Sequence, residues 1–291
     1  MHTHPVDDGT SRRTFLKQLG GVAAGGMALG LLGCTRGSEA GQPPFGPIGS
    51  QLYTVRSMMG EDVEGALGRV AEIGYDHFEF AGYYDRTIEE VAGLLEELNV
   101  NTPATHIGLG ALRDRFEEEI ARARQLGQQY VVCPYLSQGQ RGGPDQYRAL
   151  ADEFNRIGER CQEAGLQFGY HNHDFEFASE DGQVLYDILL ERTEPELVTM
   201  ELDVFWMVHA GHDPIAYFER YPGRFGLMHV KDRTESGEMA AVGEGAIDWP
   251  TIFSYADQAG TEYFFVEHDN PENPAESIAT SHQYLSQLEL S

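Results

Sequence analysis

Short apolar stretches alternate with longer amphipathic stretches from Pro47 to the end of the chain. The short stretches are rich in β-branched and aromatic residues, which is typical of buried strands, and we expect strands over residues 48–55, 75–81, 101–107, 130–135, 166–172, 197–203, 225–231 and 263–268. The stretches between them repeat apolar residues at helical spacing and predict helices, among them 63–73, 88–98, 112–126 and 146–164. Several amphipathic stretches stop at a glycine, as helices commonly do: Gly74, Gly127, Gly165 and Gly260.

Strict alternation of strand and helix predicts parallel strands with helices packed outside them. Eight such units fit one closed (β/α)8 barrel, a TIM barrel, and we assign it to residues 47–291. The competing architecture is an open doubly wound sheet. No G-x-G-x-x-G motif follows the first expected strand, so a nucleotide-binding version of that sheet lacks its main support.

The first residues of the chain read as an export signal rather than as part of the barrel. The run Ser11-Arg12-Arg13-Thr14-Phe15-Leu16-Lys17 matches a twin-arginine signal, and the apolar stretch that follows is too short to span a bilayer permanently. We therefore expect residues 1–33 to be a signal peptide, residues 34–46 to be a tether, and the protein to work in the periplasm or on the outer surface.

Leu31-Leu32-Gly33-Cys34 resembles a lipoprotein cleavage box. Cleavage there would make Cys34 the acylated first residue, which would anchor the protein to a membrane. The alternative is simple cleavage near Ser38-Glu39-Ala40, which has small residues at the required spacing. The other two cysteines, Cys133 and Cys161, fall in an expected strand and helix, so we expect buried free thiols there.

The charge of the chain narrows the possible partners. Its formal net charge is -27 over 291 residues, and no basic run occurs beyond the N-terminus. A nucleic-acid binder must neutralise phosphates with clustered Lys and Arg, so nucleic acid and polyanionic substrates are poor partners. Lysine occurs only at Lys17 and Lys231, which draws attention to Lys231 at the end of an expected strand.

Polar residues gather at the carboxyl ends of the expected strands, where active sites of such barrels lie. They are His106 on the third strand, His171-Asn172-His173 with Glu176 behind them on the fifth, Glu201-Leu202-Asp203 on the sixth, His229-Val230-Lys231-Asp232 on the seventh, and Glu267-His268-Asp269 on the eighth. Charged groups that face a barrel mouth must be neutralised, and a divalent cation neutralises carboxylates while it accepts imidazole ligands. Asp203, His229 and Glu267 with one group of the fifth strand would suit Mn²⁺, Zn²⁺, Co²⁺ or Mg²⁺.

Lys231 has two interpretations from the sequence. An ammonium whose pKa can shift suits proton transfer, oxyanion stabilisation or Schiff-base chemistry. The structural alternative is an ion pair with Asp232 or with a carboxylate of the rim.

Several separate segments resemble the sugar phosphate isomerase/epimerase family of xylose isomerase-like barrels, from Ile48 to the C-terminus. They are Ser50-Gln51-Leu52-Tyr53-Thr54-Val55, Tyr170-His171-Asn172-His173-Asp174-Phe175-Glu176-Phe177, Glu201-Leu202-Asp203, His229-Val230-Lys231-Asp232, Gly243-Glu244-Gly245-Ala246-Ile247-Asp248-Trp249 and Val266-Glu267-His268-Asp269-Asn270-Pro271. The resemblance implies a divalent metal held by a fifth-strand glutamate, a sixth-strand aspartate, a seventh-strand histidine and an eighth-strand glutamate, with the two glutamates relaying a proton. Asp203, His229 and Glu267 match three of these positions.

The fifth strand departs from the family's pattern, because His171 stands where the family's Glu-Asn-His run begins with glutamate. Either His171 binds the metal itself or Glu176 reaches back to it. His173, in the third place of that run, becomes the expected substitute for the missing base, since an imidazole titrates near working pH without much tuning.

The resemblance implies an isomerase or epimerase that acts on a sugar, keto-sugar or cyclitol. The metal would bridge a carbonyl and its neighbouring hydroxyl, Glu267 or His173 would remove the proton between them, and expulsion of a β-substituent would instead give a lyase or dehydratase. The expected substrate-binding residues are Tyr53, His106, Trp206, His209 and Arg233, with Lys231 near the reacting atoms. The alternatives are a Schiff-base lyase that uses Lys231, a non-catalytic sugar-binding lipoprotein, and an endonuclease, which the charge disfavours.

Overall fold

The computed structural model describes residues 46–290. The expected signal peptide, Cys34 and most of the expected tether lie outside these residues. None of the helices within 46–290 has the length and apolar character needed to cross a membrane.

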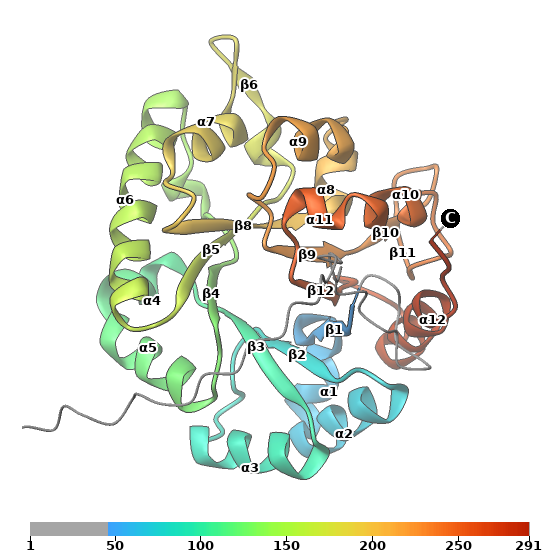
Figure 1. The fold of residues 1–291 in the computed structure, drawn as a ribbon. Helices are drawn as coiled ribbons and strands as arrows, with labels where there is room; N and C mark the ends of the chain where they lie inside the picture. Colours follow the sequence, from blue (N-terminus) through green and yellow to red (C-terminus); the bar gives the residue numbers. More distant parts are fainter. Residues whose placement is uncertain (1–45, 291) are drawn as a thin grey trace, which may run out of the picture. The chain divides into compact units, whose positions relative to one another are not determined.

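Eight parallel strands close into a barrel, as the sequence predicts (Figure 1). In hydrogen-bonded order they are β1 (Ile48–Gln51), β12 (Tyr263–Val266), β9 (Leu227–Val230), β8 (Val198–Asp203), β5 (Gln167–His171), β4 (Tyr130–Cys133), β3 (Asn101–His106) and β2 (His77–Phe80), which pairs with β1 again. Each predicted strand contains one of these strands. Seven of the eight observed strands end earlier than predicted, and β8 ends at Asp203 as predicted. Lys231 and Glu267 therefore fall just after β9 and β12, where their side chains line the opening of the barrel.

Helices lie outside the strands, as the alternating pattern requires (Figure 1). They are α1 (Arg56–Glu61), α2 (Val63–Ile73), α3 (Ile88–Leu98), α4 (Leu109–Asp114), α5 (Phe116–Gln125), α6 (Pro144–Glu163), α7 (Leu185–Arg192), α8 (Val204–His209), α9 (Pro214–Arg220), α10 (Trp249–Ser254), α11 (Ala256–Ala259) and α12 (Pro274–Ser286). The single helix expected over 112–126 is wrong: Arg115 leaves the helical region, with φ -136° and ψ 34°, and separates α4 from α5.

Local signals in the sequence explain where the helices begin and end. Thr87 and Glu90 form a capping box at the start of α3, in which each side chain accepts from the other residue's backbone N–H. Gly74 ends α2 with φ 119°, a conformation that a residue with a Cβ rarely adopts.

Two short 2-stranded sheets lie in the segments that follow β5 and β9. β6 (Ser179–Glu180) pairs with β7 (Gln183–Val184), and β10 (Asp232–Arg233) pairs with β11 (Met239–Ala240). The second hairpin follows β9 directly and so lies next to Lys231 in the chain.

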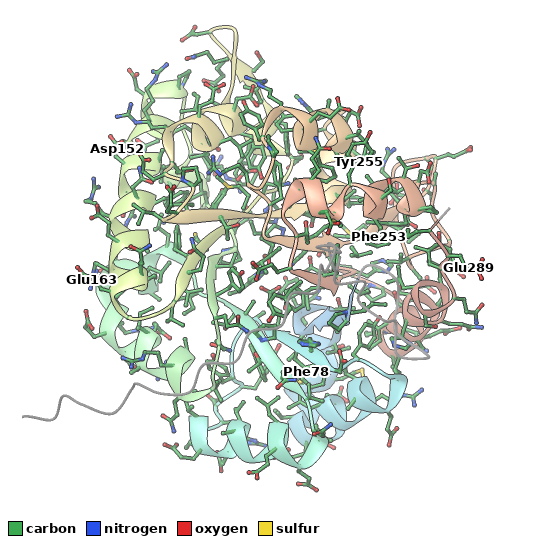
Figure 2. The ribbon with its side chains drawn as sticks, viewed as in Figure 1. Phe78, Asp152, Glu163, Phe253, Tyr255 and Glu289 are labelled. Atoms are coloured by element: carbon green, nitrogen blue, oxygen red, sulfur yellow. The ribbon has the colours of Figure 1, made fainter. Side chains whose placement is uncertain are left out.

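The apolar core has an outer and an inner part. Buried side chains such as Phe78 on β2 and Phe253 on α10 belong to the core between strands and helices, whereas charged side chains such as Glu163 and Glu289 point outward (Figure 2). Inside the barrel, a smaller apolar cluster contains Ala104, Tyr130, Val132, Leu227 and Phe265. We call this cluster the barrel floor.

Gly49 on β1 makes room for the barrel floor. A Cβ at this position would lie 2.5 Å from a ring carbon of Phe265 and 3.0 Å from the carbonyl oxygen of His77. The absence of a side chain at Gly49 therefore lets the Phe265 ring lie inside the barrel beneath the polar residues of the carboxyl ends.

Candidate active site and metal centre

A cavity of about 490 Å³ opens at the carboxyl ends of the strands, and we call this opening the mouth. Its lining combines charged, polar and aromatic side chains with a few small residues: Tyr53, Ala81, His106, Gly108, Pro134, Tyr135, His171, His173, Lys231, Glu267, Asp269 and Asn270. Another cavity, of about 350 Å³, lies near the amino ends of strands, around His77, Asn101 and Tyr263. Barrel enzymes work at the carboxyl ends, and only the first of these two cavities has a lysine and carboxylates together in its wall.

Strand register brings side chains of five strands together inside the barrel. His171 pairs with Glu201 across β5 and β8, and Asp203 pairs with His229 across β8 and β9. Because side chains alternate along a strand, Glu201 and Asp203 both face the interior, with Glu201 one layer further from the mouth. Two sets of side chains that could hold a metal ion result, and in each set the candidate ligand atoms lie within 4.8 Å of one another.

We call the set nearer the mouth the upper cluster; it consists of His171, Asp203, His229 and Glu267. The other set, the deep cluster, consists of His106, His171, Glu201 and His229. All members except His106 are buried, and the side chain of His106 is only 7% exposed. The two clusters share two imidazoles, which therefore connect the layers.

Three imidazoles surround one carboxylate oxygen in the deep cluster. Glu201 Oε2 lies 2.7 Å from His106 Nε2, 3.2 Å from His229 Nε2 and 3.6 Å from His171 Nδ1. Glu79 on β2 lies beside this cluster, with its Oε2 2.8 Å from His229 Nε2 and 2.7 Å from the amide nitrogen of Gln51.

In the upper cluster, Lys231 contacts both carboxylates. Its Nζ lies 3.0 Å from Glu267 Oε2 and 3.3 Å from Asp203 Oδ2, and it also lies 2.6 Å from Asp269 Oδ1. The imidazoles complete the network: His229 Nδ1 is 2.9 Å from Glu267 Oε2, and His171 Nε2 is 3.3 Å from Asp203 Oδ2. An ammonium has three N–H donors, so these three carboxylates can use all of them.

The ion pairs of the upper cluster keep Lys231 and Glu267 charged by shifting their pKa values. Burial alone would lower the pKa of Lys231, but Asp203, Glu267 and Asp269 outweigh it and raise that pKa above its usual value. Burial would raise the pKa of Glu267, but the charges of Lys231 and then His229 hold it well below its usual range. Lys231 is therefore an ammonium ion and Glu267 a carboxylate at neutral pH.

The two carboxyl groups in and beside the deep cluster, those of Glu201 and Glu79, have pKa values shifted in opposite directions. Burial and the nearby charge of Glu201 raise the pKa of Glu79 to about 7. Burial acts in the same direction on Glu201, but His229 and His106 outweigh it and hold the pKa of Glu201 well below its usual range. Glu201 therefore carries the negative charge on which the three imidazoles converge.

Two further groups of the cavity wall have shifted pKa values. Burial raises the pKa of Asp269 to about 6, and the charge of Glu267 acts in the same direction. Burial lowers the pKa of His173 to about 3, assisted by His171. The expectation that His173 titrates near working pH is therefore corrected: burial keeps this imidazole neutral, so it can accept a proton only weakly.

Glu176, the alternative fifth-strand metal ligand, belongs to neither cluster. It is fully buried, accepts a hydrogen bond from the hydroxyl of Tyr170, and accepts another from the backbone N–H of His173 at 2.8 Å. Tyr170 belongs to the outer core, where its ring packs against Phe154 with the centroids 5.0 Å apart. Glu176 thus fixes the turn after β5, and His171 is the fifth-strand side chain that reaches the clusters.

Replacing Glu176 with glutamine is expected to make stability less dependent on pH. Burial raises the pKa of Glu176 to about 7, so the folded protein binds this proton more tightly than the unfolded chain does, and stability falls as pH rises from about 4.5 to about 7. Glutamine carries no charge: its carbonyl oxygen can accept from the backbone N–H of His173, and its amide N–H can donate to the hydroxyl oxygen of Tyr170. At pH 8, thermal unfolding should show Glu176→Gln to be more stable than the original chain by on the order of 2 kcal/mol, with a smaller difference at pH 5. An equal effect at both pH values would contradict this role for the carboxyl group.

The structure separates the expected substrate-binding residues into two groups. Tyr53 and His106 line the cavity, whereas Trp206, His209 and Arg233 are absent from its wall. Trp206 packs behind it, with its ring 5.5 Å from that of His173 and 5.3 Å from Lys231 Nζ. His209 is exposed and stacks on Phe205 with the centroids 5.4 Å apart.

Gln51, Glu79 and Tyr135 belong to this region, yet the sequence did not mark them as site residues, and it placed Asp269 at this end of the barrel without giving it a role. Glu79 had a usable signal, since it is a charged residue between two phenylalanines in an expected strand. Tyr135 is 47% exposed at the mouth, and Tyr53 is 42% exposed; each has a guanidinium over its ring, Arg141 at 4.6 Å and Arg56 at 4.0 Å.

The donor atoms of this region suit a divalent ion. Both clusters combine imidazole nitrogens with carboxylate oxygens, the mixed set that zinc and related metals accept. Buried atoms without a hydrogen-bond partner point to the same conclusion: among the described residues they include Glu201 Oε1 and His171 Nδ1. Such atoms are costly to bury unless they bind a ligand.

Known proteins are similar to this chain in sequence and in fold. An inosose dehydratase of Geobacillus kaustophilus is 26% identical over 228 residues, which cover 65% of this chain and 73% of that protein. An inosose dehydratase of Lacticaseibacillus casei is 26% identical over 163 residues, which span 48% of this chain and 54% of that protein.

A crystal structure of a sugar phosphate isomerase/epimerase from Parabacteroides distasonis superimposes with a TM-score of 0.72 at 26% identity. The superposition covers 86% of this chain and 95% of that one. Residues 67–288 also match the family described as xylose isomerase-like TIM barrel. Since that match includes most of the barrel, the chain belongs to the xylose isomerase-like TIM barrel family.

Proposed function

We propose that the protein is an enzyme that abstracts a proton next to the carbonyl of a sugar, keto-sugar or cyclitol, as an isomerase or epimerase does. The observation that carries this proposal is the mouth cavity, whose wall combines Glu267, Asp269, Lys231 and His173. Its volume of about 490 Å³ falls in the range of small-molecule sites, about 300–1,000 Å³. The relatedness to inosose dehydratases and to a sugar phosphate isomerase/epimerase supports the substrate class.

Glu267 is the proposed base, and its free oxygen is Oε1. In the described part of the chain, its ion pairs with His229 and Lys231 both end on Oε2. Oε2 is thus fixed by two partners, while Oε1 remains to accept a proton from a substrate carbon in the cavity. Its strongly lowered pKa makes the free carboxylate a weak base, so a substrate must bring a C–H group that is already acidified by its carbonyl.

Lys231 contributes positive charge rather than a nucleophilic amine. A Schiff base requires a neutral amine, but three carboxylates hold Lys231 as an ammonium ion. The charge lies in the cavity wall, where it stabilises negative charge that develops on a substrate oxygen. This arrangement disfavours the alternative of a Schiff-base lyase.

A divalent ion is part of the proposal, with Mn²⁺, Zn²⁺, Co²⁺ and Mg²⁺ as the options. The upper-cluster residues His171, Asp203, His229 and Glu267 would hold it near the substrate. When bound there, the ion supplies positive charge to a carbonyl and its neighbouring hydroxyl, which acidifies the carbon between them.

A dehydratase is the second function that a specific observation favours. The relatives from Geobacillus kaustophilus and Lacticaseibacillus casei are both described as inosose dehydratases. Elimination begins with the same proton abstraction and differs in the departure of a β-hydroxyl group; Asp269, which lines the cavity, would protonate that group. Burial raises the pKa of Asp269 to about 6, so this carboxyl group can hold a proton in mildly acidic solution.

Incubation of the purified protein with inososes, ketohexoses and keto-glycosides in D₂O tests both functions. We expect deuterium to enter the carbon next to the carbonyl of at least one substrate, accompanied by an epimer or isomer, or by loss of water if the protein is a dehydratase. Mass spectrometry and NMR distinguish these products. If a sugar binds but neither exchanges nor reacts, the protein is a sugar-binding member of the family and the proposed function is wrong.

A further inference from the structure

A second cavity adjoins the mouth cavity at the carboxyl ends of β2 and β3. It has a volume of about 470 Å³, and its lining consists of residues 82–88, residues 105–108, Ala111, Arg115, Glu119 and Arg122. We call it the side cavity; it shares His106 and Gly108 with the mouth cavity. We propose that the side cavity binds a second sugar ring, so that the substrate is a glycosylated keto-sugar whose keto ring lies in the mouth cavity. This inference deepens the proposed function and rests on it.

The boundary between the two cavities is open at two glycines. Gly108 lines both cavities, and a Cβ at this position would have no neighbour within 4 Å. Ala81 lines the mouth cavity, and the next residue, Gly82, lines the side cavity, again with nothing within 4 Å of a Cβ. A ligand can therefore extend from the mouth cavity into the side cavity between the ends of β2 and β3.

Tyrosines flank this passage. Tyr53 lines the mouth cavity, and Tyr83 and Tyr84 line the side cavity. Burial raises the pKa of Tyr84, while Arg56 lowers it and Tyr53 raises it further, so Tyr53 and Tyr84 lie near one another. A tyrosine combines an apolar ring face with a polar hydroxyl, and the rings of a disaccharide present both kinds of surface.

The loop after β2 holds Tyr84 in a conformation that a residue with a side chain rarely adopts. Tyr84 has φ 52°, and the next residue, Asp85, has φ 60°. Left-handed backbone at non-glycine residues is common in segments that hold a ligand. The loop thus brings an aromatic and an acidic side chain together in the wall of the side cavity.

The charged groups of the side cavity fit hydroxyl groups better than phosphate. Each of its three arginines has a carboxylate partner, at 2.9, 2.9 and 2.6 Å: Arg86 with Glu64, Arg115 with Glu119 and Arg122 with Glu118. A phosphate would have to compete with these carboxylates for the guanidinium groups. Sugar hydroxyls both donate and accept, so they can use the remaining guanidinium N–H groups together with the carboxylate oxygens of Asp85 and Glu119. The side cavity therefore favours a neutral sugar ring.

Fructose and its glucosyl derivatives are the probes for the test. Turanose, maltulose and palatinose carry the same keto-sugar with a second ring attached at different positions. We expect calorimetry to show that at least one of the three binds to the full purified chain about tenfold more tightly than fructose. Its kcat/KM for deuterium exchange should rise in the same proportion. Fructose 6-phosphate should bind no more tightly than fructose.

Ala111→Phe places an aromatic ring in the side cavity. Ala111 lies on α4 and lines the side cavity but not the mouth cavity. The variant should lose the preference for the glucosyl derivative, a fall of about tenfold in affinity, and exchange deuterium into fructose at the original rate. Ala121→Phe, the same change at an exposed position of α5, is the matched control and should keep the preference.

Several results would overturn the inference. They are a panel in which no glucosyl derivative binds more tightly than fructose, tighter binding of fructose 6-phosphate than of all three, or a preference that survives in Ala111→Phe. A crystal of the original chain soaked with the tightest-binding derivative does not depend on how a variant folds. Density for the second ring is expected beside Tyr84 and Ala111, and density for that ring outside the side cavity would refute the inference.

Failure of the proposed function gives a different result. A glucosyl derivative that binds in both cavities, loses its preference in Ala111→Phe and exchanges no deuterium would support the side cavity as a sugar site and contradict the proposed chemistry. Deuterium exchange into fructose without any preference for a second ring would support the chemistry and contradict the side cavity.

Discussion

Replacing Glu267 with glutamine is expected to reduce turnover about 10³-fold while the protein remains folded, because it removes the proposed base. Glutamine has the shape of glutamate, so the side chain still fills its place between His229 and Lys231. The amide cannot accept a proton from a substrate carbon at neutral pH. The measurement is kcat on whichever substrate the D₂O screen identifies, together with the rate of deuterium exchange at the carbon next to the carbonyl.

The same strand offers a matched control. Glu262 lies just before the amino end of β12 and accepts a hydrogen bond from the hydroxyl of Tyr130 at 2.8 Å, at the opposite end of the barrel from the mouth. Glu262→Gln should retain the original kcat. Should Glu267→Gln exchange deuterium at the original rate, another group removes the proton and the assignment of Glu267 is wrong.

Replacing Lys231 with methionine is expected to produce the largest loss of stability. Methionine preserves the length of the apolar stem but leaves three carboxylates, those of Asp203, Glu267 and Asp269, without their shared ammonium. Removing one partner from a buried ion-pair network typically costs about 3–5 kcal/mol. In a protein of this size that corresponds to a fall in Tm of roughly 10 °C, measurable by calorimetry in the presence of a chelator.

An exposed ion pair serves as the comparison for Lys231. Arg113 is 42% exposed and forms two hydrogen bonds of 2.7 Å with Glu153, so Arg113→Met should cost no more than about 1 kcal/mol. Adding Zn²⁺ to Lys231→Met should recover part of the lost stability, because a cation can then enter the upper cluster. A Tm for Lys231→Met within 2–3 °C of the Arg113→Met value, which corresponds to about 1 kcal/mol, would show that the three carboxylates do not depend on the ammonium.

The alternating pattern of the chain was sufficient to predict the barrel, because each strand and each helix buries a recognisable apolar face. The ends of α2 and α3 were predicted correctly from the helical spacing of apolar residues, and Gly74 marks the end of α2 in the sequence. The break between α4 and α5 was missed, because Arg115 is a good helix former and only the local path of the chain takes it out of the helical region.

The site was less predictable, since it depends on which way side chains point and on how deeply they are buried. Glu79 lies between two phenylalanines on a strand buried on both faces, so alternation alone could not show that it faces the barrel interior. Lys231 pairs with the carboxylates of the rim and not with Asp232, whose carboxylate instead accepts from the backbone N–H groups of Arg233 and Gly243. The low pKa of His173 follows from burial, which no sequence motif displays.

The barrel floor has a consequence for how small molecules enter and leave. The barrel floor lies beneath the two charged clusters, and four of its side chains are fully buried: Phe265, Leu227, Val132 and Ala104. This apolar layer closes the inner end of the barrel to hydrated ions. Small molecules and ions would therefore enter and leave only through the mouth, and a sugar bound there would block the path of an ion bound below it. A metal ion bound in these layers, as proposed, would have to enter before the substrate, and a bound substrate would slow its release.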